Sequence, residues 1–189
     1  MTGRRGGAFL DRDGTIIEDA EYIERADDVT LLPGAAAAIR ALNDAGVPVI
    51  VVSNQSGIGR GYFTHADYER VQARVAELLA ISGARIDAVY ICPHAPAADG
   101  GATCECRKPG TLLFRTAAGE HGLDLARSWC VGDRWRDVAP ARELGARAIL
   151  VPSAVTPPDD LARARTERVE VSTTLAAAAE RIVRGMRER

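Results

Sequence analysis

The stretch Val47-Pro48-Val49-Ile50-Val51-Val52 carries the strongest indication of the fold in this sequence. A run of β-branched residues without polar alternation is typical of a strand buried on both faces, as in a parallel sheet. The proline stands near the start of the run, where a strand tolerates it. An alanine-rich helix is predicted before it, over 35–45, ending at Gly46. After it, Thr64 and Asp67 form a capping-box pattern that begins another helix.

The same alternation of strand and helix continues on both sides of this stretch. Short apolar runs indicate four further strands, over residues 8–10, 86–92, 128–131 and 146–151. Periodic segments indicate three further helices, at about 111–121, 135–144 and 173–187. Between the last strand and the last helix, Pro157-Pro158 breaks the chain before a polar stretch. This pattern predicts an α/β fold with a Rossmann-like parallel sheet of about five strands and helices on both faces.

Length, composition and charge limit the class of protein. The 189 residues suit one domain, and the intervals between the predicted elements are too short for a separate cap domain. The 24 basic and 26 acidic residues leave a net charge of −2, whereas a surface that coats nucleic acid usually shows a basic excess. No apolar run is long enough for a membrane span or a signal peptide. We therefore expect a cytoplasmic monomer with a small-molecule substrate and no nucleic-acid or membrane partner.

Acidic and hydroxyl side chains directly follow three of the predicted strands. Asp11 and Asp13 follow the first strand, Ser53 follows the stretch quoted above, and Asp133 follows the strand over 128–131. Ligands of open α/β sheets bind beyond the carboxyl ends of the strands, so we expect these side chains to meet there. Crowded carboxylates need a hard cation, and Mg²⁺ prefers oxygen ligands. The sequence therefore predicts a magnesium site at Asp11, Asp13 and Asp133, beside a carboxylate that can attack phosphorus.

Lys108 is the single lysine of the chain, because the other 23 basic residues are arginines. GC-rich codons would explain the excess of arginine, and chance could leave one lysine behind. Taken alone, the single lysine therefore does not decide whether this position has a specific role. A retained lysine would supply a compact ammonium where a planar guanidinium does not fit. Together with the hydroxyl of Ser53, it could oppose the negative charge that spreads over a phosphoryl group during its transfer.

Three of the four cysteines lie close together in a loop over about 92–109. Cys92-x-His94 and Cys104-x-Cys106 offer three thiolates and one imidazole, which is the ligand set of a closed structural zinc site. The alternative is that the cysteines pack in the interior and that His94 lies on the surface. A small loop with few apolar residues needs a metal to be ordered, which favours structural zinc.

Four segments, in this order and spacing, resemble the motifs of the haloacid dehalogenase superfamily of phosphatases. They are Asp11-x-Asp13-Gly14-Thr15, Ser53-Asn54, Lys108-Pro109 and Gly132-Asp133-x-x-x-Asp137. The first alone also fits a calcium loop, but an EF-hand needs a glutamate at its twelfth position, where this chain has Tyr22. The resemblance covers about residues 7–152. It implies that Asp11 is the nucleophile, that Asp13 is the general acid and base, and that Ser53 and Lys108 stabilise the phosphoryl group.

The zinc loop narrows this resemblance to the histidinol-phosphatase-like branch. Within that branch, segments 53–61 and 106–109 look most like the phosphatases that remove the 7-phosphate of D-glycero-D-manno-heptose 1,7-bisphosphate through an aspartyl-phosphate. A histidinol-phosphate phosphatase and a non-catalytic zinc-binding interaction module stay open as alternatives. The substrate contacts that the resemblance implies are Asp19, Tyr22, Asn54, Gln55, Ser56, Arg107 and Arg134. Segment 19–22 lacks the His-Gly-Tyr form that is often seen in this family. Two roles stay open for Asp137: it orients Lys108 or a metal-bound water, or it is an acidic residue in the first turn of a helix.

Overall fold

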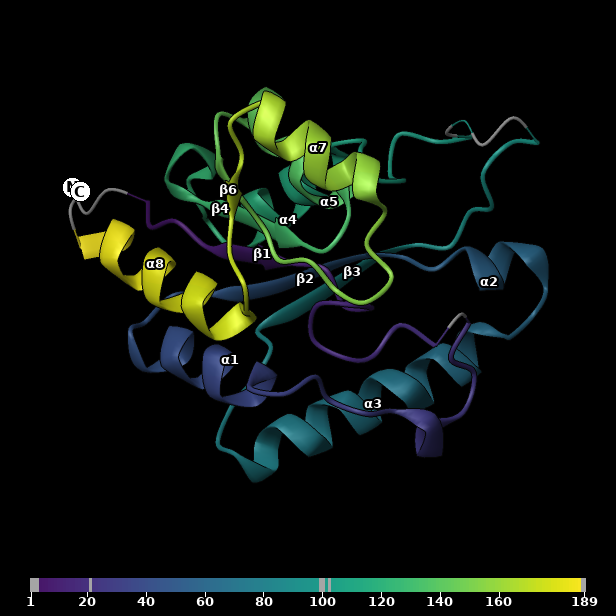
Figure 1. The fold of residues 1–189 in the computed structure, drawn as a ribbon. Coiled ribbons are helices and arrows are strands. Elements are labelled where there is room, and N and C mark those ends of the chain that lie inside the picture. Colours follow the sequence, from purple (N-terminus) through teal and green to yellow (C-terminus); the bar gives the residue numbers. More distant parts are fainter. Residues whose placement is uncertain (1–3, 21, 99–100, 102, 188–189) are drawn as a thin grey trace.

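The sheet is parallel throughout and has helices on both faces (Figure 1). The computed structural model describes residues 4–20, 22–98, 101 and 103–187. The described residues contain six strands: β1 (Ala8–Leu10), β2 (Val49–Asn54), β3 (Ala88–Cys92), β4 (Trp129–Gly132), β5 (Arg147–Leu150) and β6 (Glu170–Val171). Their order across the sheet is β3-β2-β1-β4-β5-β6. This arrangement confirms the predicted α/β class with a Rossmann-like sheet.

Helices alternate with the strands along the chain. They are α1 (Ala35–Asp44), α2 (Ser56–Arg60), α3 (His65–Ile81), α4 (Leu112–Glu120), α5 (Trp135–Val138), α6 (Pro140–Leu144), α7 (Pro158–Thr166) and α8 (Leu175–Arg187). The predicted capping box begins α3: the hydroxyl of Thr64 accepts a hydrogen bond from the backbone N–H of Asp67, and the Asp67 carboxylate accepts one from the backbone N–H of Thr64.

Alternate residues of the central strands enter two different cores. Leu10 and Val51 pack with α1, α3 and α8 on one face of the sheet, whereas Phe9 and Ile50 pack with α4 and α6 on the other (Figure 1). Because both faces of β1 and β2 are covered, their side chains are apolar without alternation. The polar residues that directly follow these strands therefore lie at one end of the sheet.

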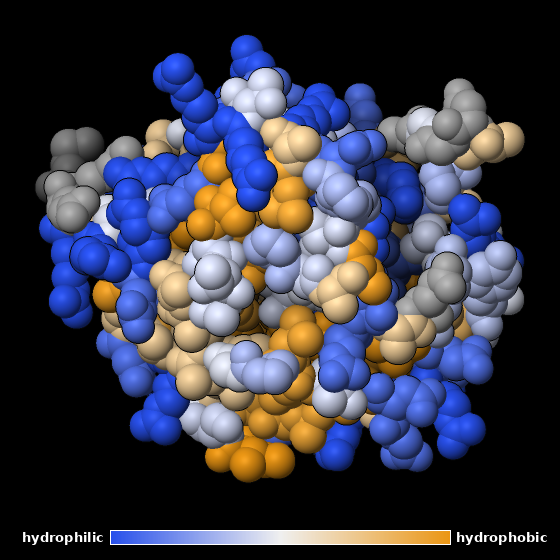
Figure 2. Space-filling model, in the orientation of Figure 1, coloured by the Kyte–Doolittle hydropathy of each residue, from blue (hydrophilic) through white to orange (hydrophobic). Residues whose placement is uncertain are grey.

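The structure contains the short helix α2, which was not predicted, and differs from the predicted fold in three further places. It has six strands rather than about five, because β6 consists of two exposed residues and has no apolar run. The polar stretch after Pro157 contains α7, which begins at a proline in its first turn and buries Ala164 alone, so it has little periodicity. Hydrophilic side chains gather over α7 in Figure 2. The predicted helix over 135–144 is divided into α5 and α6 at Pro140, which has no N–H to donate.

No helix of the described ranges combines the length and apolar character that crossing a membrane would require.

Candidate active site

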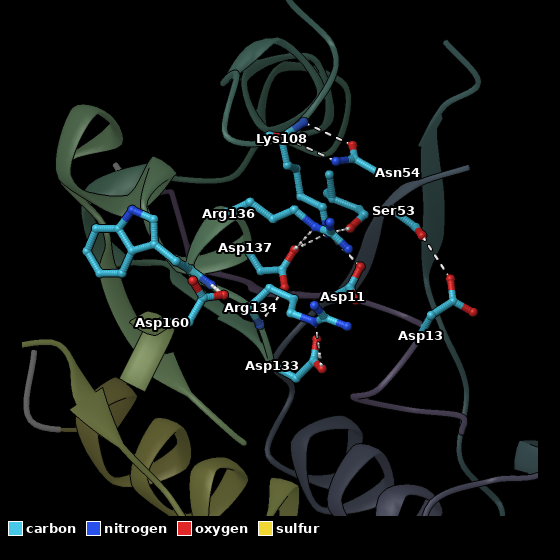
Figure 3. Close-up of polar contacts among 12 residues, drawn as sticks. Asp11, Asp13, Ser53, Asn54, Lys108, Asp133, Arg134, Arg136, Asp137 and Asp160 are labelled. Atoms are coloured by element: carbon cyan, nitrogen blue, oxygen red, sulfur yellow. Dashed lines mark hydrogen bonds and ion pairs between the residues drawn. The ribbon is translucent and has the colours of Figure 1, made fainter. Parts of the chain in front are cut away.

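The carboxyl ends of β1, β2 and β4 bring the predicted catalytic residues together (Figure 3). Asp11 continues β1 beside β4, since its backbone N–H donates to the carbonyl of Val131 at 2.9 Å. Ser53 lies near the end of β2, and Asp133 directly follows β4. Asp11, Ser53 and Asp133 are all buried. The meeting of these side chains, which was predicted from their positions after the strands, is thus present in the structure.

Lys108 lies at the centre of this group, although it comes from the loop before α4 (Figure 3). Its Nζ donates to Asp11 Oδ1 at 2.6 Å and to the carbonyl of Val52 at 2.6 Å, and it pairs with Asp137 Oδ1 at 2.8 Å. Its side chain is 1% exposed. Burial alone would lower the pKa of Lys108, but the two carboxylates outweigh it and raise that pKa. The ammonium therefore stays charged beside the expected nucleophile.

Asn54 holds the backbone of Lys108. Its Nδ2 donates to the carbonyl of Lys108 at 3.1 Å, and its Oδ1 accepts from the N–H of Lys108 at 2.9 Å. Both polar ends of the amide are thereby occupied, so the structure gives Asn54 a positioning role for Lys108. Asn54 also lines the cavity in front of Asp11, and its predicted contact with a substrate stays a prediction.

Asp11, Asp133 and Asp137 bring carboxylate oxygens close enough together to hold one metal ion. One oxygen of Asp133 accepts a hydrogen bond from Ser153 Oγ at 2.6 Å, while the other is buried without a hydrogen-bond partner among the described residues. Burial raises the pKa of Asp11 to about 7, and the Lys108 ammonium opposes that rise. A buried carboxylate oxygen with no partner and crowded acidic groups fit a hard cation such as Mg²⁺.

The carboxylate of Asp13 lies outside this cluster, and the contact with magnesium that was predicted for Asp13 stays a prediction. Its Oδ1 accepts from Nε and Nη2 of Arg12 at 3.1 and 3.0 Å. Its Oδ2 accepts from Nε2 of Gln55 at 2.8 Å, and Ser53 Oγ lies 3.5 Å away. The side chain is 23% exposed and lines the cavity in front of Asp11. Asp13 therefore presents its carboxylate to the cavity, where the predicted proton transfer would take place.

Asp137 combines both roles that were considered for it. Its Oδ1 pairs with Lys108, while its Oδ2 accepts a hydrogen bond from the backbone N–H of Arg134 at 2.9 Å, at the start of α5. Gly132 makes this packing possible, because a Cβ there would stand 2.3 Å from Cβ of Asp137. Gly14, at φ +80°, likewise leaves room for Asp133, whose Oδ2 would lie 2.5 Å from an added Cβ.

The predicted zinc ligands form a second cluster at the end of β3. Cys92, His94, Cys104 and Cys106 place their ligand atoms within 4.8 Å of one another, and the three cysteines are free thiols. The Sγ atoms of Cys104 and Cys106 lie 3.1 Å apart, and Nδ1 of His94 lies 3.2 Å from Sγ of Cys106. Three thiols and one imidazole in such proximity fit tetrahedral zinc. Loop residues 99, 100 and 102 lie outside the described residues.

We expect the purified protein to contain about one zinc per chain, because four protein ligands close the coordination sphere. Elemental analysis measures this directly. Cys106→Ser should lower the zinc content, whereas Cys130→Ala should retain it, because Cys130 is fully buried in the core and outside the cluster. Fully folded, active wild-type protein without zinc would contradict the assignment.

A cavity of about 250 Å³ opens in front of Asp11 and Asp13. Of the predicted substrate contacts, Asp19, Tyr22, Asn54, Gln55, Ser56 and Arg107 line it. Arg134 is not among its lining residues and instead pairs with Asp19 and Asp133, in both cases at 3.5 Å. Arg107 is tied to the zinc cluster, since its Nη1 donates to the carbonyl of His94 at 3.3 Å.

Sequence reasoning missed three cationic residues of this cavity, Arg12, Arg60 and Arg136. All three lie within or beside the segments that carry the resemblance, but arginine is so abundant in this chain that none of them stood out. A spacing signal was nonetheless present, because Arg136 directly precedes the last aspartate of the fourth motif.

Comparison with known proteins agrees with this geometry. A family model described as HAD-hydrolase-like matches residues 105–178. A D-glycero-D-manno-heptose-1,7-bisphosphate 7-phosphatase of Thermosynechococcus vestitus is 44% identical over 154 residues, which cover 78% of this chain and 79% of that protein. A D-glycero-beta-D-manno-heptose-1,7-bisphosphate 7-phosphatase of Pseudomonas aeruginosa is 40% identical over 144 residues, covering 76% and 79% of the two chains.

The fold is also similar to that of solved phosphatases. The crystal structure of D,D-heptose 1,7-bisphosphate phosphatase from B. bronchiseptica, complexed with magnesium and phosphate, aligns with a TM-score of 0.85 and 33% identity. The alignment covers 95% of this chain and 98% of that one. The corresponding enzyme from Burkholderia thailandensis aligns with a TM-score of 0.71 and 30% identity over 95% and 99% of the two chains.

Proposed function

Because this chain belongs to the HAD-like hydrolases, in the family of the heptose-1,7-bisphosphate 7-phosphatases, we propose that it removes the 7-phosphate of D-glycero-D-manno-heptose 1,7-bisphosphate. The observation that carries the proposal is the contact between Lys108 and Asp11, beside Asp133, at a cavity lined by Asp13. This geometry and the phosphatase names of the relatives favour an enzyme over a non-catalytic zinc-binding module.

In the proposed reaction a carboxylate oxygen of Asp11 attacks the phosphorus of the ester. The bond between phosphorus and the sugar oxygen breaks, and Asp13 gives its proton to the leaving alkoxide. Asp13 then takes a proton from water, which attacks the phosphorus of the aspartyl-phosphate. Inorganic phosphate leaves, and both the Asp11 carboxylate and the protonated Asp13 are regenerated. The two side chains suit these roles because Asp11 is buried against Lys108 while Asp13 faces the cavity.

Lys108 and Ser53 stabilise the charge that develops during this transfer. The Lys108 ammonium is fixed by Asp11, Asp137 and the carbonyl of Val52, so it need not reorganise when charge appears on the phosphoryl oxygens. Asp11 and Asp133, which belong both to the predicted magnesium site and to the cluster of carboxylates, would hold Mg²⁺. When bound, the ion supplies further positive charge to the phosphoryl oxygens.

We expect Mg²⁺-dependent release of phosphate from heptose 1,7-bisphosphate, and much slower release from histidinol phosphate. Steady-state kinetics with both substrates, with Mg²⁺ added or chelated, measure this directly. The reaction should stop when a chelator removes Mg²⁺ and should return when Mg²⁺ is restored, because the predicted zinc ligands form a separate cluster. A higher kcat/KM for histidinol phosphate would overturn the assigned substrate but leave the chemistry intact.

A further inference from the structure

The carboxylates that line the cavity already have cationic partners. Asp11 pairs with Lys108 at 2.6 Å, and Asp13 pairs with Arg12 at 3.0 Å. Asp19 pairs with Arg134 at 3.5 Å. Lys108 and Arg12 are almost fully buried, and each is paired with one of these aspartates at the inner end of the cavity, which Arg12 helps to line. Any charge that the cavity offers to a ligand at its mouth must therefore come from other residues.

Three guanidinium groups supply such a charge: Arg60, Arg107 and Arg136 all line the cavity. Within the described part of the chain, neither Arg60 nor Arg107 forms an ion pair with a carboxylate. Arg136 has one distant ion pair, at 4.0 Å from Asp137 Oδ1, an oxygen that Lys108 already contacts at 2.8 Å (Figure 3). The side chain of Arg136 is 44% exposed.

Arg107 and Arg136 reach the same cavity from two different segments of the chain. The two residues are held in place by different elements: Arg107 by its hydrogen bond to the zinc loop, and Arg136 by the first turn of α5. Like charges that the fold holds together are a ready site for an anion, and arginine forks suit the oxygens of a phosphate.

We propose that Arg136, together with Arg107, binds the phosphate of the substrate that is not transferred, and that Arg136 thereby determines the preference for a bisphosphate. This inference rests on the proposed function, because it assumes a sugar that carries two phosphates. The transferred phosphate already has Lys108 and Ser53, which are buried beside Asp11, whereas Arg136 reaches the cavity from its exposed side. Arg136 is thus a specificity-determining residue.

The test compares two substrates that share the transferred phosphate: heptose 1,7-bisphosphate and heptose 7-phosphate. For Arg136→Gln we expect the KM of the bisphosphate to rise roughly tenfold or more, as for loss of a charged hydrogen bond, with kcat nearly unchanged. The kcat/KM of the monophosphate should stay within about twofold, because it never occupied the Arg136 site. Arg136→Lys should restore part of the preference, since it keeps the charge but not the fork.

Arg142→Gln is the matched control, because Arg142 lies on the neighbouring α6 with a side chain that is 90% exposed and is absent from the cavity. Arg142→Gln should leave kcat and KM unchanged for both substrates. The proposal would be overturned if Arg136→Gln lowered kcat/KM equally for both substrates, or if it left the preference for the bisphosphate unchanged.

Failure of the proposed function would look different, because the wild type would then hydrolyse neither heptose ester. In that case the comparison moves to inhibition of p-nitrophenyl phosphate hydrolysis by fructose 1,6-bisphosphate and by fructose 6-phosphate. Arg136→Gln should weaken inhibition by the bisphosphate roughly tenfold and leave inhibition by the monophosphate unchanged. Any other pattern overturns the role of Arg136.

Discussion

Asp11→Asn is expected to abolish the release of phosphate, with less than about a hundredth of the wild-type rate left. The amide keeps the shape of the carboxylate but cannot form the aspartyl-phosphate. The variant should still fold, because Lys108 retains Asp137 at 2.8 Å and the carbonyl of Val52 at 2.6 Å. Single-turnover and steady-state phosphate release are the measurements, with thermal unfolding to confirm the fold. A rate above about a hundredth of wild type would show that Asp11 is not the nucleophile.

Asp13→Asn provides the informative comparison, because its carboxylate lies outside the cluster of Asp11, Asp133 and Asp137. The first step should be slow but possible for a good leaving group, whereas hydrolysis of the aspartyl-phosphate loses its base. Intact-protein mass spectrometry after mixing with p-nitrophenyl phosphate should then detect a covalent phosphate on Asp13→Asn and none on Asp11→Asn. A covalent phosphate on the Asp11 variant would contradict the assignment of these two roles.

Lys108→Arg should lower kcat by roughly a hundredfold or more, since a transition-state contact of this kind carries ~2.7–4 kcal/mol. The ammonium has two carboxylates and a carbonyl within 2.8 Å and is 1% exposed, so the larger guanidinium cannot take the same position. Arg107→Lys is the contrasting variant and should mainly raise KM, because Arg107 lines the cavity away from Asp11. A Lys108→Arg enzyme with nearly wild-type kcat would contradict this role, and the single lysine would then be an accident of composition.

Lys108 is also expected to contribute to stability, because it is the cation between two buried carboxylates. Lys108→Met would leave Asp11 and Asp137 buried without their cation, and loss of one partner from a buried ion pair typically costs about 3–5 kcal/mol. Thermal unfolding of Lys108→Met should therefore show a clear loss of stability. The loss should be smaller in the presence of Mg²⁺, which would compensate the charge of Asp11.

Much of the site could be predicted because its residues have fixed positions relative to strands. A parallel sheet places the carboxyl ends of its strands at one edge, so Asp11, Ser53 and Asp133 had to lie near one another once the strands were identified. The clustering of Cys92, His94, Cys104 and Cys106 could likewise be predicted from residue type and spacing alone. Elements without an apolar pattern, such as α7 and β6, could not, because they bury almost nothing.

The sequence by itself thus determined the α/β class, the order of the motifs and the identity of the residues that meet at the sheet edge, because periodicity and strand position are local properties. Only the tertiary structure decided which way each side chain points. It placed Asp137 rather than the carboxylate of Asp13 with Asp11 and Asp133, used Asn54 to hold Lys108, and turned Arg136 rather than Arg134 into the cavity. Neighbouring residues in a turn point in different directions, and the packing of distant segments selects among them. Charge balance also depends on contacts between segments far apart in the chain, as the pairing of Lys108 with Asp11 shows.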